Sequence, residues 1–391
     1  MLFSPRANSV YPIFAHAGRA WLDGAELYFE AHRPAGLDRF RYSPAVAALF
    51  APLALLPDGV GGCAWRLLNA AVFLGGFAWV CAAVLPGWGA LSRGRRAALW
   101  LLMVPVAVGS LNNGQSNPLV AGLLMMAVAG VAERRWNLAA VCITGAVLFK
   151  GYPLAIGLLL AAVYPRRFAP RLALALAVGL LLPFLLQRPE YVAHEYGSWL
   201  RLMGADDRKD GPVSCGYRDL WVLCQAVGIP LSRQWYMAIQ LTTAGGLAAM
   251  CLVARWGGWP RRRLLAMLWG LGTCWMMLCG PATESSTYVM LAPVLAWAVL
   301  DAWTRCNSWA RHLPPISFAL LAVSSAACWF PVGKDLHTLG VQPLAALLLT
   351  VALMATHLKR GSRLAVSGQS PSASEGVADG RAGARALTTS H

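Results

Sequence analysis

Charged side chains are scarce in this sequence. Asp, Glu, Lys and Arg together make up 13% of the 391 residues, whereas a soluble domain carries about a quarter. Hydrophobic residues account for 58%, and they recur in runs of roughly twenty residues, a length that crosses a bilayer as a helix. The shortage of charge excludes an ordinary soluble domain and predicts an all-α, polytopic integral membrane protein.

Recognisable metal and nucleotide motifs are also lacking. The ten cysteines show none of the CxxC or Cys/His spacings that are typical of zinc sites. No Gly-rich phosphate loop follows an expected strand, which argues against a Rossmann-type nucleotide-sugar site. We therefore expect neither a metal nor a cofactor. Cys215 and Cys224 share a long polar stretch, and their spacing leaves open whether they form a disulfide.

The net charge of +16 does not indicate nucleic-acid binding, because the arginines gather in short turns between apolar runs. Such basic turns tend to face the cytoplasm. The basic turns lie at residues 93–96, 134–135, 166–171, 255–263, 305–311 and 359–363. Placing all of them in the cytoplasm assigns to the external face residues 1–60, the turns at 112–117, 150–152, 281–285 and 331–339, and the long loop 188–233. We expect this membrane to be the plasma membrane.

Three regions follow from this topology. Residues 61–360 are predicted to form a bundle of about 10–11 membrane segments. Residues 361–391 are rich in Ser, Ala and Gly, and we expect a disordered cytoplasmic tail. Residues 1–60 form an external segment that contains several arginines. That segment has no helix to translocate it, so we expect a further membrane helix upstream, excluded by a late start codon or lost.

The external amino-terminal segment has two apolar patterns of its own. Apolar residues recur at helical spacing from Tyr11 to Tyr28, and the pattern meets a turn at Asp23-Gly24. This predicts an amphipathic helix at the membrane interface. The apolar stretch Ala45–Leu56 is too short for a comfortable crossing, so it predicts a partial or re-entrant helix packed against protein.

Two polar clusters end neighbouring apolar runs on the expected external face. The first contains Asn113, Gln115 and Asn117, whose amides can hydrogen-bond hydroxyl groups. The second contains Lys150 and Tyr152, and the lysine ammonium can hold a phosphate. Together they suit a sugar carried on a lipid phosphate. The alternative interpretation is a simple Asn-Gly turn and a lysine that snorkels to the interface.

An ordered set of motifs resembles glycosyltransferase family 87. The motifs are GRAWLDGAELY, RYSPAVAALFAPLALLP, NNGQSNPLVAGLLMMA, LFKGYPLAIGLLL and ATESSTYVMLAPVLAW, spanning residues 8 to 305. The resemblance implies a GT-C-like helical bundle with a non-cytoplasmic active site. It implies transfer of a hexosyl, typically mannosyl, group from a polyprenyl-phosphate sugar to a lipid or glycan acceptor among membrane lipids. It further implies that Lys150 holds the donor phosphate and that Gln115 and Asn117 line the sugar pocket.

The sequence departs from this family at the general base. The family carries an aspartate just before a Val-Tyr pair; here Val10-Tyr11 is present, but Ala7 and Asn8 stand at the expected positions. A neutral amide can orient a hydroxyl but cannot take its proton. External carboxylates that could substitute are Asp23, Glu26, Asp38, Asp206 and Asp207, with Asp38 and Asp207 as the catalytic candidates. The alternative for each is a solvated loop charge.

Two other positions keep two interpretations each. Glu284 is either a pocket carboxylate or a helix amino-terminal charge that complements the helix dipole. Arg218 either forms an ion pair with Asp219 that shapes the external loop or contacts a diphosphate. A degenerate protein that binds lipid-linked sugar without turnover remains an alternative function because of the missing aspartate. A transporter or flippase would use Lys150 and Glu284, but the two related halves typical of transporters are not found.

Overall fold

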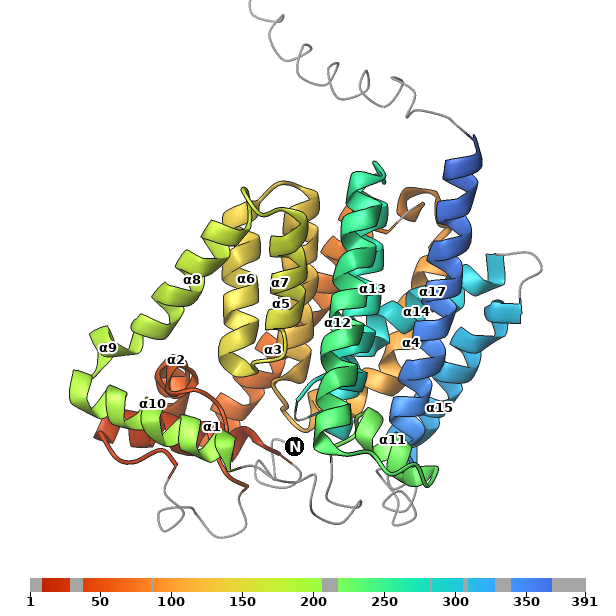
Figure 1. Cartoon of the computed structure of the whole chain (residues 1–391). Coiled ribbons are helices and arrows are strands. Elements are labelled where there is room, and N and C mark those ends of the chain that lie inside the picture. The colour runs from red at the N-terminus through yellow and green to blue at the C-terminus, as the bar shows by residue number, and fades with distance from the viewer. Residues whose placement is uncertain are drawn as a thin grey trace, which may run out of the picture.

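The computed structural model is a bundle of helices (Figure 1) and describes residues 9–28, 38–85, 87–205, 217–281, 283–304, 309–327 and 339–367. No strand occurs within these ranges, so the all-α prediction is confirmed. The α-helices are α1 Tyr11–Asp23, α2 Pro44–Ala54, α3 Asp58–Ala83, α4 Arg93–Asn112, α5 Asn117–Ala132, α6 Trp136–Phe149, α7 Leu154–Val163, α8 Ala169–Leu181, α9 Pro183–Leu186, α10 Pro189–Gly204, α11 Leu220–Ala226, α12 Arg233–Trp256, α13 Arg261–Cys279, α14 Ala292–Thr304, α15 Leu313–Ala327 and α17 Val341–Ser367. Short 3₁₀ helices are η2 Trp88–Ala90, η3 Ser285–Leu291 and η4 Trp309–His312.

Among the described residues, five helical stretches are long and apolar enough to cross a membrane: α3, α4, α8 with α9, α12, and η3 with most of α14. Helices α2, α5, α6, α7 and the first part of α17 are apolar but shorter. Almost all of α5 is buried, which explains how a short helix is tolerated at membrane depth, since protein rather than lipid surrounds it. The multi-pass membrane prediction is confirmed, whereas the expected number of segments stays a prediction.

The bundle has a packed centre and an apolar outside. Helices α5 and α13 are buried along most of their length. By contrast, α8 and α12 bury few residues and expose large side chains such as Leu174, Leu181, Leu241 and Val253. Outward-facing apolar side chains at this density match a hydrocarbon surrounding.

The predicted elements of the amino-terminal segment are present. The expected amphipathic helix is α1, and it ends at the predicted turn, with Gly24 in the left-handed region at a φ of 66°. The expected partial helix is α2. The region 188–233, expected as a loop, contains the helices α10 and α11. Figure 1 shows α1, α2 and α10 together at one end of the bundle.

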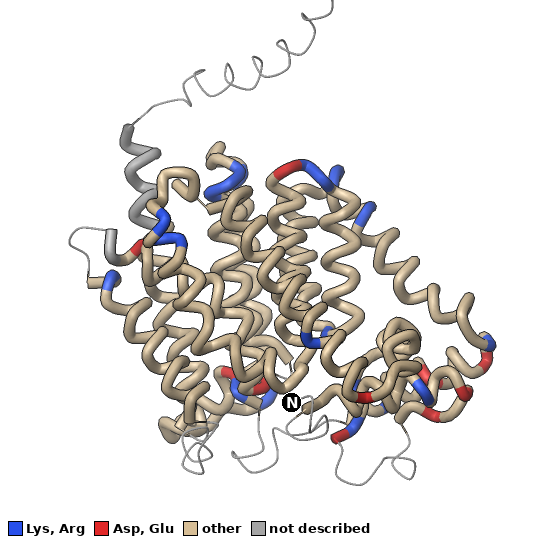
Figure 2. The backbone as a smooth tube through the Cα atoms, turned by 180° about the vertical axis from the view of Figure 1, so that it is seen from behind, with Lys and Arg blue, Asp and Glu red and all other residues tan. Residues whose placement is uncertain are grey.

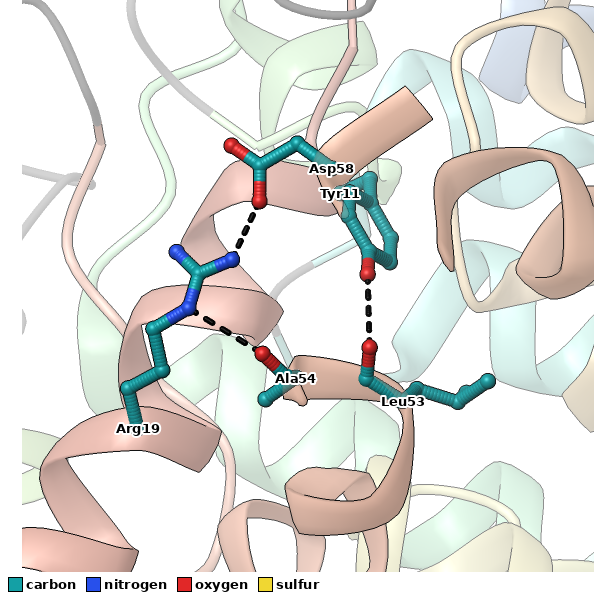
Figure 3. A network of polar contacts seen from close by, with 5 residues as sticks. All are labelled: Tyr11, Arg19, Leu53, Ala54 and Asp58. Atoms are coloured by element: carbon teal, nitrogen blue, oxygen red, sulfur yellow. Dashed lines mark hydrogen bonds and ion pairs between the residues drawn. The ribbon is translucent and has the colours of Figure 1, made fainter. Parts of the chain in front are cut away.

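A polar network joins α1 to the ends of α2 and α3 (Figure 3). Arg19 donates from Nε to the carbonyl oxygen of Ala54 at 3.1 Å and forms an ion pair with Asp58. The Tyr11 hydroxyl donates to the carbonyl oxygen of Leu53 at 3.1 Å. The last carbonyl groups of a helix lack partners inside the helix, so α1 supplies the donors that α2 needs where it stops.

The basic turns gather at the end of the bundle that is far from the described amino terminus. Figure 2 shows mostly Lys and Arg at that end, with few Asp or Glu, whereas residues of both charges occur near α1 and α10. The connections α5–α6, α7–α8 and α12–α13, which carry arginines, lie at that far end in Figure 1. This grouping agrees with the expected topology, and the identity of the cytoplasmic side stays a prediction.

Two glycines, Gly76 on α3 and Gly122 on α5, bring the backbones of these helices into close contact. A Cβ added to Gly76 would lie 2.5 Å from the carbonyl oxygen of Gly122, and one added to Gly122 would collide with the backbone at Val72. Small residues let membrane helices pack at this distance. Because α5 begins in the 112–117 turn, the crossing also sets where that turn lies.

We expect Gly76→Ala to lower the free energy of unfolding by about 1–3 kcal/mol, because the two backbones must separate. The matched control is Gly75→Ala, since an added Cβ there meets nothing within 4 Å. The control should be neutral or stabilise the protein by up to about 1 kcal/mol through helix propensity. Thermal unfolding of the purified protein in detergent measures both variants, and equal losses would contradict the close crossing.

Candidate functional site

The 112–117 turn is hydrogen-bonded to α3. Arg66 donates from Nε to the carbonyl oxygen of Asn112 at 2.9 Å, and Trp65 donates from Nε1 to the carbonyl oxygen of Gly114 at 2.7 Å. Gly114 has a φ of 66°, a left-handed conformation that glycine adopts without strain. The turn that the Asn-Gly pair predicted is therefore present, and its main chain is bonded to a neighbouring helix.

The first described residues lie against the same turn. The Val10 N–H donates to the carbonyl oxygen of Asn113 at 3.0 Å, and the guanidinium that holds the turn also donates to Ser9 Oγ at 2.8 Å. Ala7 and Asn8, where the family's aspartate is expected, lie outside the described residues. Ser9 and Val10 thus lie against the 112–117 turn, which we call the amide turn.

Residues at the end of the turn bond to two distant segments. Ser116 Oγ donates to the Tyr42 hydroxyl at 3.4 Å, and Asn117 Nδ2 donates to Ser286 Oγ at 3.0 Å. Asn117 is fully buried, and its Oδ1 has no hydrogen-bond partner among the residues that the structure describes. One buried amide oxygen is therefore left to accept a hydrogen bond from a donor such as a hydroxyl group.

Lys150 and Tyr152 join this group at the break between α6 and α7. Lys150 ends α6 in an extended conformation, and its Nζ lies 5.9 Å from the centroid of the Tyr152 ring. Burial raises the pKa of Tyr152 well above its usual value, and the neighbouring Tyr42 and Glu284 raise it further. The phenol therefore stays protonated at neutral pH.

Glu284 begins η3 as a capping residue. Its carboxylate accepts the backbone N–H of Thr287, while the Glu284 N–H donates to Thr287 Oγ1 at 3.1 Å. Burial raises the pKa of Tyr42 above its usual value, and the charge of Glu284 contributes to that rise. Glu284 therefore caps η3 and lies close enough to the two tyrosines to affect their pKa, and its role as a pocket carboxylate stays a prediction.

We call these residues the site cluster: Tyr42, Ser116, Asn117, Lys150, Tyr152, Glu284 and Ser286. The sequence analysis did not identify Tyr42, Ser116 or Ser286, because hydroxyl groups recur throughout the sequence and their pairing depends on long-range packing. The available signal was position, since Tyr42 precedes the proline that begins α2 and Ser286 follows Glu284. Gln115 and Asn113 lie half-buried in the turn beside the cluster.

Arg218 lies next to the cluster through its main chain. Its N–H donates to the carbonyl oxygen of Thr283 at 2.6 Å, and its carbonyl oxygen accepts from the Tyr288 hydroxyl at 2.7 Å. Asp219 caps α11 and accepts from the Tyr236 hydroxyl at 2.8 Å. The bonds of Arg218 attach this part of the 188–233 region to η3 and the residues before it, and the bond of Asp219 attaches it to α12.

Among the expected base candidates that the structure describes, Asp38 contributes to the raised pKa of Tyr42. Asp38 is exposed, and its Oδ1 accepts the N–H of Arg39 at 2.8 Å. Glu26 instead faces His194 at 3.8 Å, and Asp23 is exposed at the end of α1. Asp206, Asp207 and Cys215 lie outside the described residues.

Comparison with known proteins shows what the chain is similar to. Residues 40–281 match the model of glycosyltransferase family 87. The chain is 31% identical over 135 residues to GPI mannosyltransferase 1 of Trypanosoma brucei brucei, a match that covers 34% of this chain and only 30% of that protein. ArnT from Cupriavidus metallidurans, solved with undecaprenyl phosphate, is similar with a TM-score of 0.35 and 16% identity, over 88% of this chain and 72% of that one.

The bond between Asn117 and Ser286 should show up as a coupling energy. Asn117→Ala and Ser286→Ala should each lower the free energy of unfolding by about 1–2 kcal/mol, and the double variant should fall short of the sum by about 0.5–1.5 kcal/mol. Ser317→Ala is the control, since Ser317 bonds to the carbonyl oxygen of Ala345 elsewhere in the bundle and should add to Asn117→Ala. Unfolding in detergent measures all of them; additivity of the first pair would exclude the bond.

Proposed function

Because the chain belongs to glycosyltransferase family 87, we propose that it is a membrane transferase for a lipid-linked sugar. It moves a hexosyl group from a polyprenyl-phosphate donor to a lipid or glycan acceptor. The family implies a GT-C-like bundle for this chemistry. The choice of mannose draws on the name of the partial relative, GPI mannosyltransferase 1. In this transfer the acceptor oxygen forms a bond to the anomeric carbon. The bond between the anomeric carbon and the phosphate oxygen breaks, and polyprenyl phosphate leaves with its electron pair.

The observation that carries the proposal is the meeting of three polar segments at one end of the bundle. The amide turn, Lys150 with Tyr152, and η3 lie around Tyr42. An ammonium at the end of a helix is a suitable point charge for a phosphate whose lipid tail lies in the bilayer. In this proposal Lys150 holds the donor phosphate, and Arg218, whose main chain bonds to Thr283 and Tyr288, assists it.

The sugar would lie against the amide turn. Asn117 Oδ1 is buried with no partner among the described residues, and Gln115 and Asn113 supply further amides. Tyr42 and Tyr152 remain protonated and can donate to sugar oxygens. Donors and acceptors in this mixture suit the hydroxyl groups of a hexose.

The acceptor hydroxyl needs a base, and we propose Asp38. Its exposed carboxylate acts on Tyr42, whereas the carboxylate of Glu284 already caps η3. Asp207 remains a second candidate. If the protein binds lipid-linked sugar without turnover, as Ala7 and Asn8 in place of the family's aspartate would favour, none of these carboxylates acts as a base.

We place the reaction on the external face of the plasma membrane. The connections α4–α5 and α6–α7, which carry the amide turn and Lys150, lie toward the end of the bundle opposite the basic turns (Figure 1), and basic turns favour the cytoplasm. A donor held on a lipid phosphate replaces the nucleotide sugar, which is confined to the cytoplasm.

Lys150→Ala should abolish transfer from radiolabelled polyprenyl-phosphate mannose to total membrane lipid, because the phosphate loses its cation. Lys150→Arg should keep part of the activity, since it retains the charge in a different geometry. The control is Arg95→Ala, an exposed arginine at the far end of the bundle, which should transfer at the wild-type rate. Undiminished transfer by Lys150→Ala would remove the donor-phosphate role.

Asp38→Asn should lower kcat by about 10²–10⁴-fold if Asp38 takes the hydroxyl proton. Glu284→Gln keeps acceptors for the cap and should retain more than a tenth of the activity. Glu190→Gln, an exposed carboxylate on α10, controls for the loss of a negative charge. Steady-state kinetics on the three variants decides: full activity of Asp38→Asn would assign the base elsewhere. Donor binding without transfer by the wild-type protein would favour the degenerate alternative.

A further inference from the structure

Helix α10 bonds to the main chain of the amino-terminal segment through one face. The three side chains involved are spaced four residues apart, so they lie in a row along the helix. We call this row the α10 clamp: Tyr191 donates to the carbonyl oxygen of Ala25 at 2.7 Å, Glu195 Oε2 accepts the N–H of Leu27 at 3.0 Å, and Trp199 Nε1 donates to the carbonyl oxygen of Arg41 at 3.2 Å. The clamp therefore holds both flanks of residues 29–37, and Figure 1 shows α10 beside α1 and α2.

The clamped main chain leads directly to the site cluster. Tyr28, which follows the clamped Leu27, donates from its hydroxyl to the carbonyl oxygen of Tyr42 at 2.6 Å. Tyr42 also follows the clamped Arg41, and its hydroxyl accepts from Ser116. Both flanks of the clamped segment thus meet at Tyr42, the residue that joins the amide turn to the other polar segments.

Tyr42 is also enclosed by rings on the site side. Its ring centroid lies 4.7 Å from that of Phe14 and 6.4 Å from that of Phe149, the residue before Lys150. Because Tyr42 bonds to Ser116 and packs against Phe149, a shift of its backbone would move the hydroxyl relative to the amide turn and to the end of α6.

Glu195 is an unusual residue for a purely structural contact. Its side chain is fully buried, and its Oε1 has no hydrogen-bond partner among the described residues. Burial raises the pKa of Glu195; the Leu27 N–H and His194 oppose this rise, and Glu26 adds to it. A buried carboxylate with one unsatisfied oxygen costs stability. The benefit that offsets this cost is the position in which the Leu27 bond holds the main chain.

We propose that the α10 clamp sets the position of Tyr42 in the site cluster, with Glu195 as a positioning residue that acts through Leu27 and Tyr28. The kinetic part rests on the proposed function, because it is that reaction which uses Tyr42. The structural part stands on the hydrogen bonds alone and can be tested without turnover.

The experiment compares Glu195→Ala, Glu195→Gln and Trp199→Phe with Glu190→Gln, an exposed carboxylate on the same helix. Hydrogen–deuterium exchange of the full chain in detergent, without substrate, reports the amides of residues 25–28 and 40–43. Kinetics with polyprenyl-phosphate mannose and total membrane lipid report kcat and the donor KM.

Glu195→Ala should speed exchange in both stretches at least tenfold and lower kcat at least tenfold. The donor KM should change less than threefold, because Lys150 is untouched. Glu195→Gln should stay close to wild type in both measurements, since its amide carbonyl can still accept the Leu27 N–H. Trp199→Phe keeps the ring but removes one donor, and it should speed exchange at 40–43. Glu190→Gln should match wild type.

Two results would overturn the clamp. One is unchanged exchange at 40–43 in Glu195→Ala and Trp199→Phe. The other is a loss in Glu195→Gln equal to that in Glu195→Ala, which would assign the role to the charge and not to the hold on Leu27. If Glu195→Ala does not fold, Trp199→Phe and Glu195→Gln still decide. A wild-type protein that transfers nothing defeats the proposed function, while the exchange measurement still tests the clamp.

Discussion

The site depends on how helices that stop inside a membrane bundle have their last main-chain groups satisfied. Lipid offers no hydrogen bonds, so every short helix needs donors and acceptors from its neighbours. Arg66 and Trp65 provide donors where α4 ends and the amide turn follows, and Arg19 provides one where α2 ends. Ser43 donates to the carbonyl oxygen of Leu148 near the end of α6 at 2.9 Å. Because their last main-chain groups have hydrogen-bond partners, these helices can end within the bundle, and the polar groups of the site lie where they end.

Close packing and polar satisfaction support each other here. The α3–α5 crossing at Gly76 and Gly122 brings the α3 face that carries Trp65 and Arg66 against the turn from which α5 starts. A wider crossing would draw the donors away from the turn's carbonyl groups and leave them unsatisfied in a buried place. Gly122 lies in the second turn of α5, close to where the 112–117 turn ends, so the helix crossing and the turn depend on each other.

Local patterns were enough to predict much of this arrangement. Hydropathy predicted the helical membrane bundle, glycine and aspartate predicted the end of α1, and the Asn-Gly pair predicted the turn. Other features depend on contacts between residues far apart in sequence, such as Ser116 with Tyr42 and Asn117 with Ser286; no local pattern marks which hydroxyl groups meet. Helix α10 was predictable in principle, because Tyr191, Glu195 and Trp199 recur at helical spacing within a region interpreted as a loop.

The distribution of charge around Tyr42 fits a transfer from a phosphate. A phosphate needs cations nearby and is repelled by carboxylates, most strongly where water is excluded. Lys150 stands at the end of α6, whereas the carboxylate of Glu284 accepts an N–H at the start of η3, where the helix dipole compensates its charge. Asp38 is exposed, on the segment held by α10. The cation and the exposed carboxylate thus come from different elements. In the proposed transfer, Lys150 would hold the leaving group and Asp38 would deprotonate the acceptor hydroxyl at a separate point.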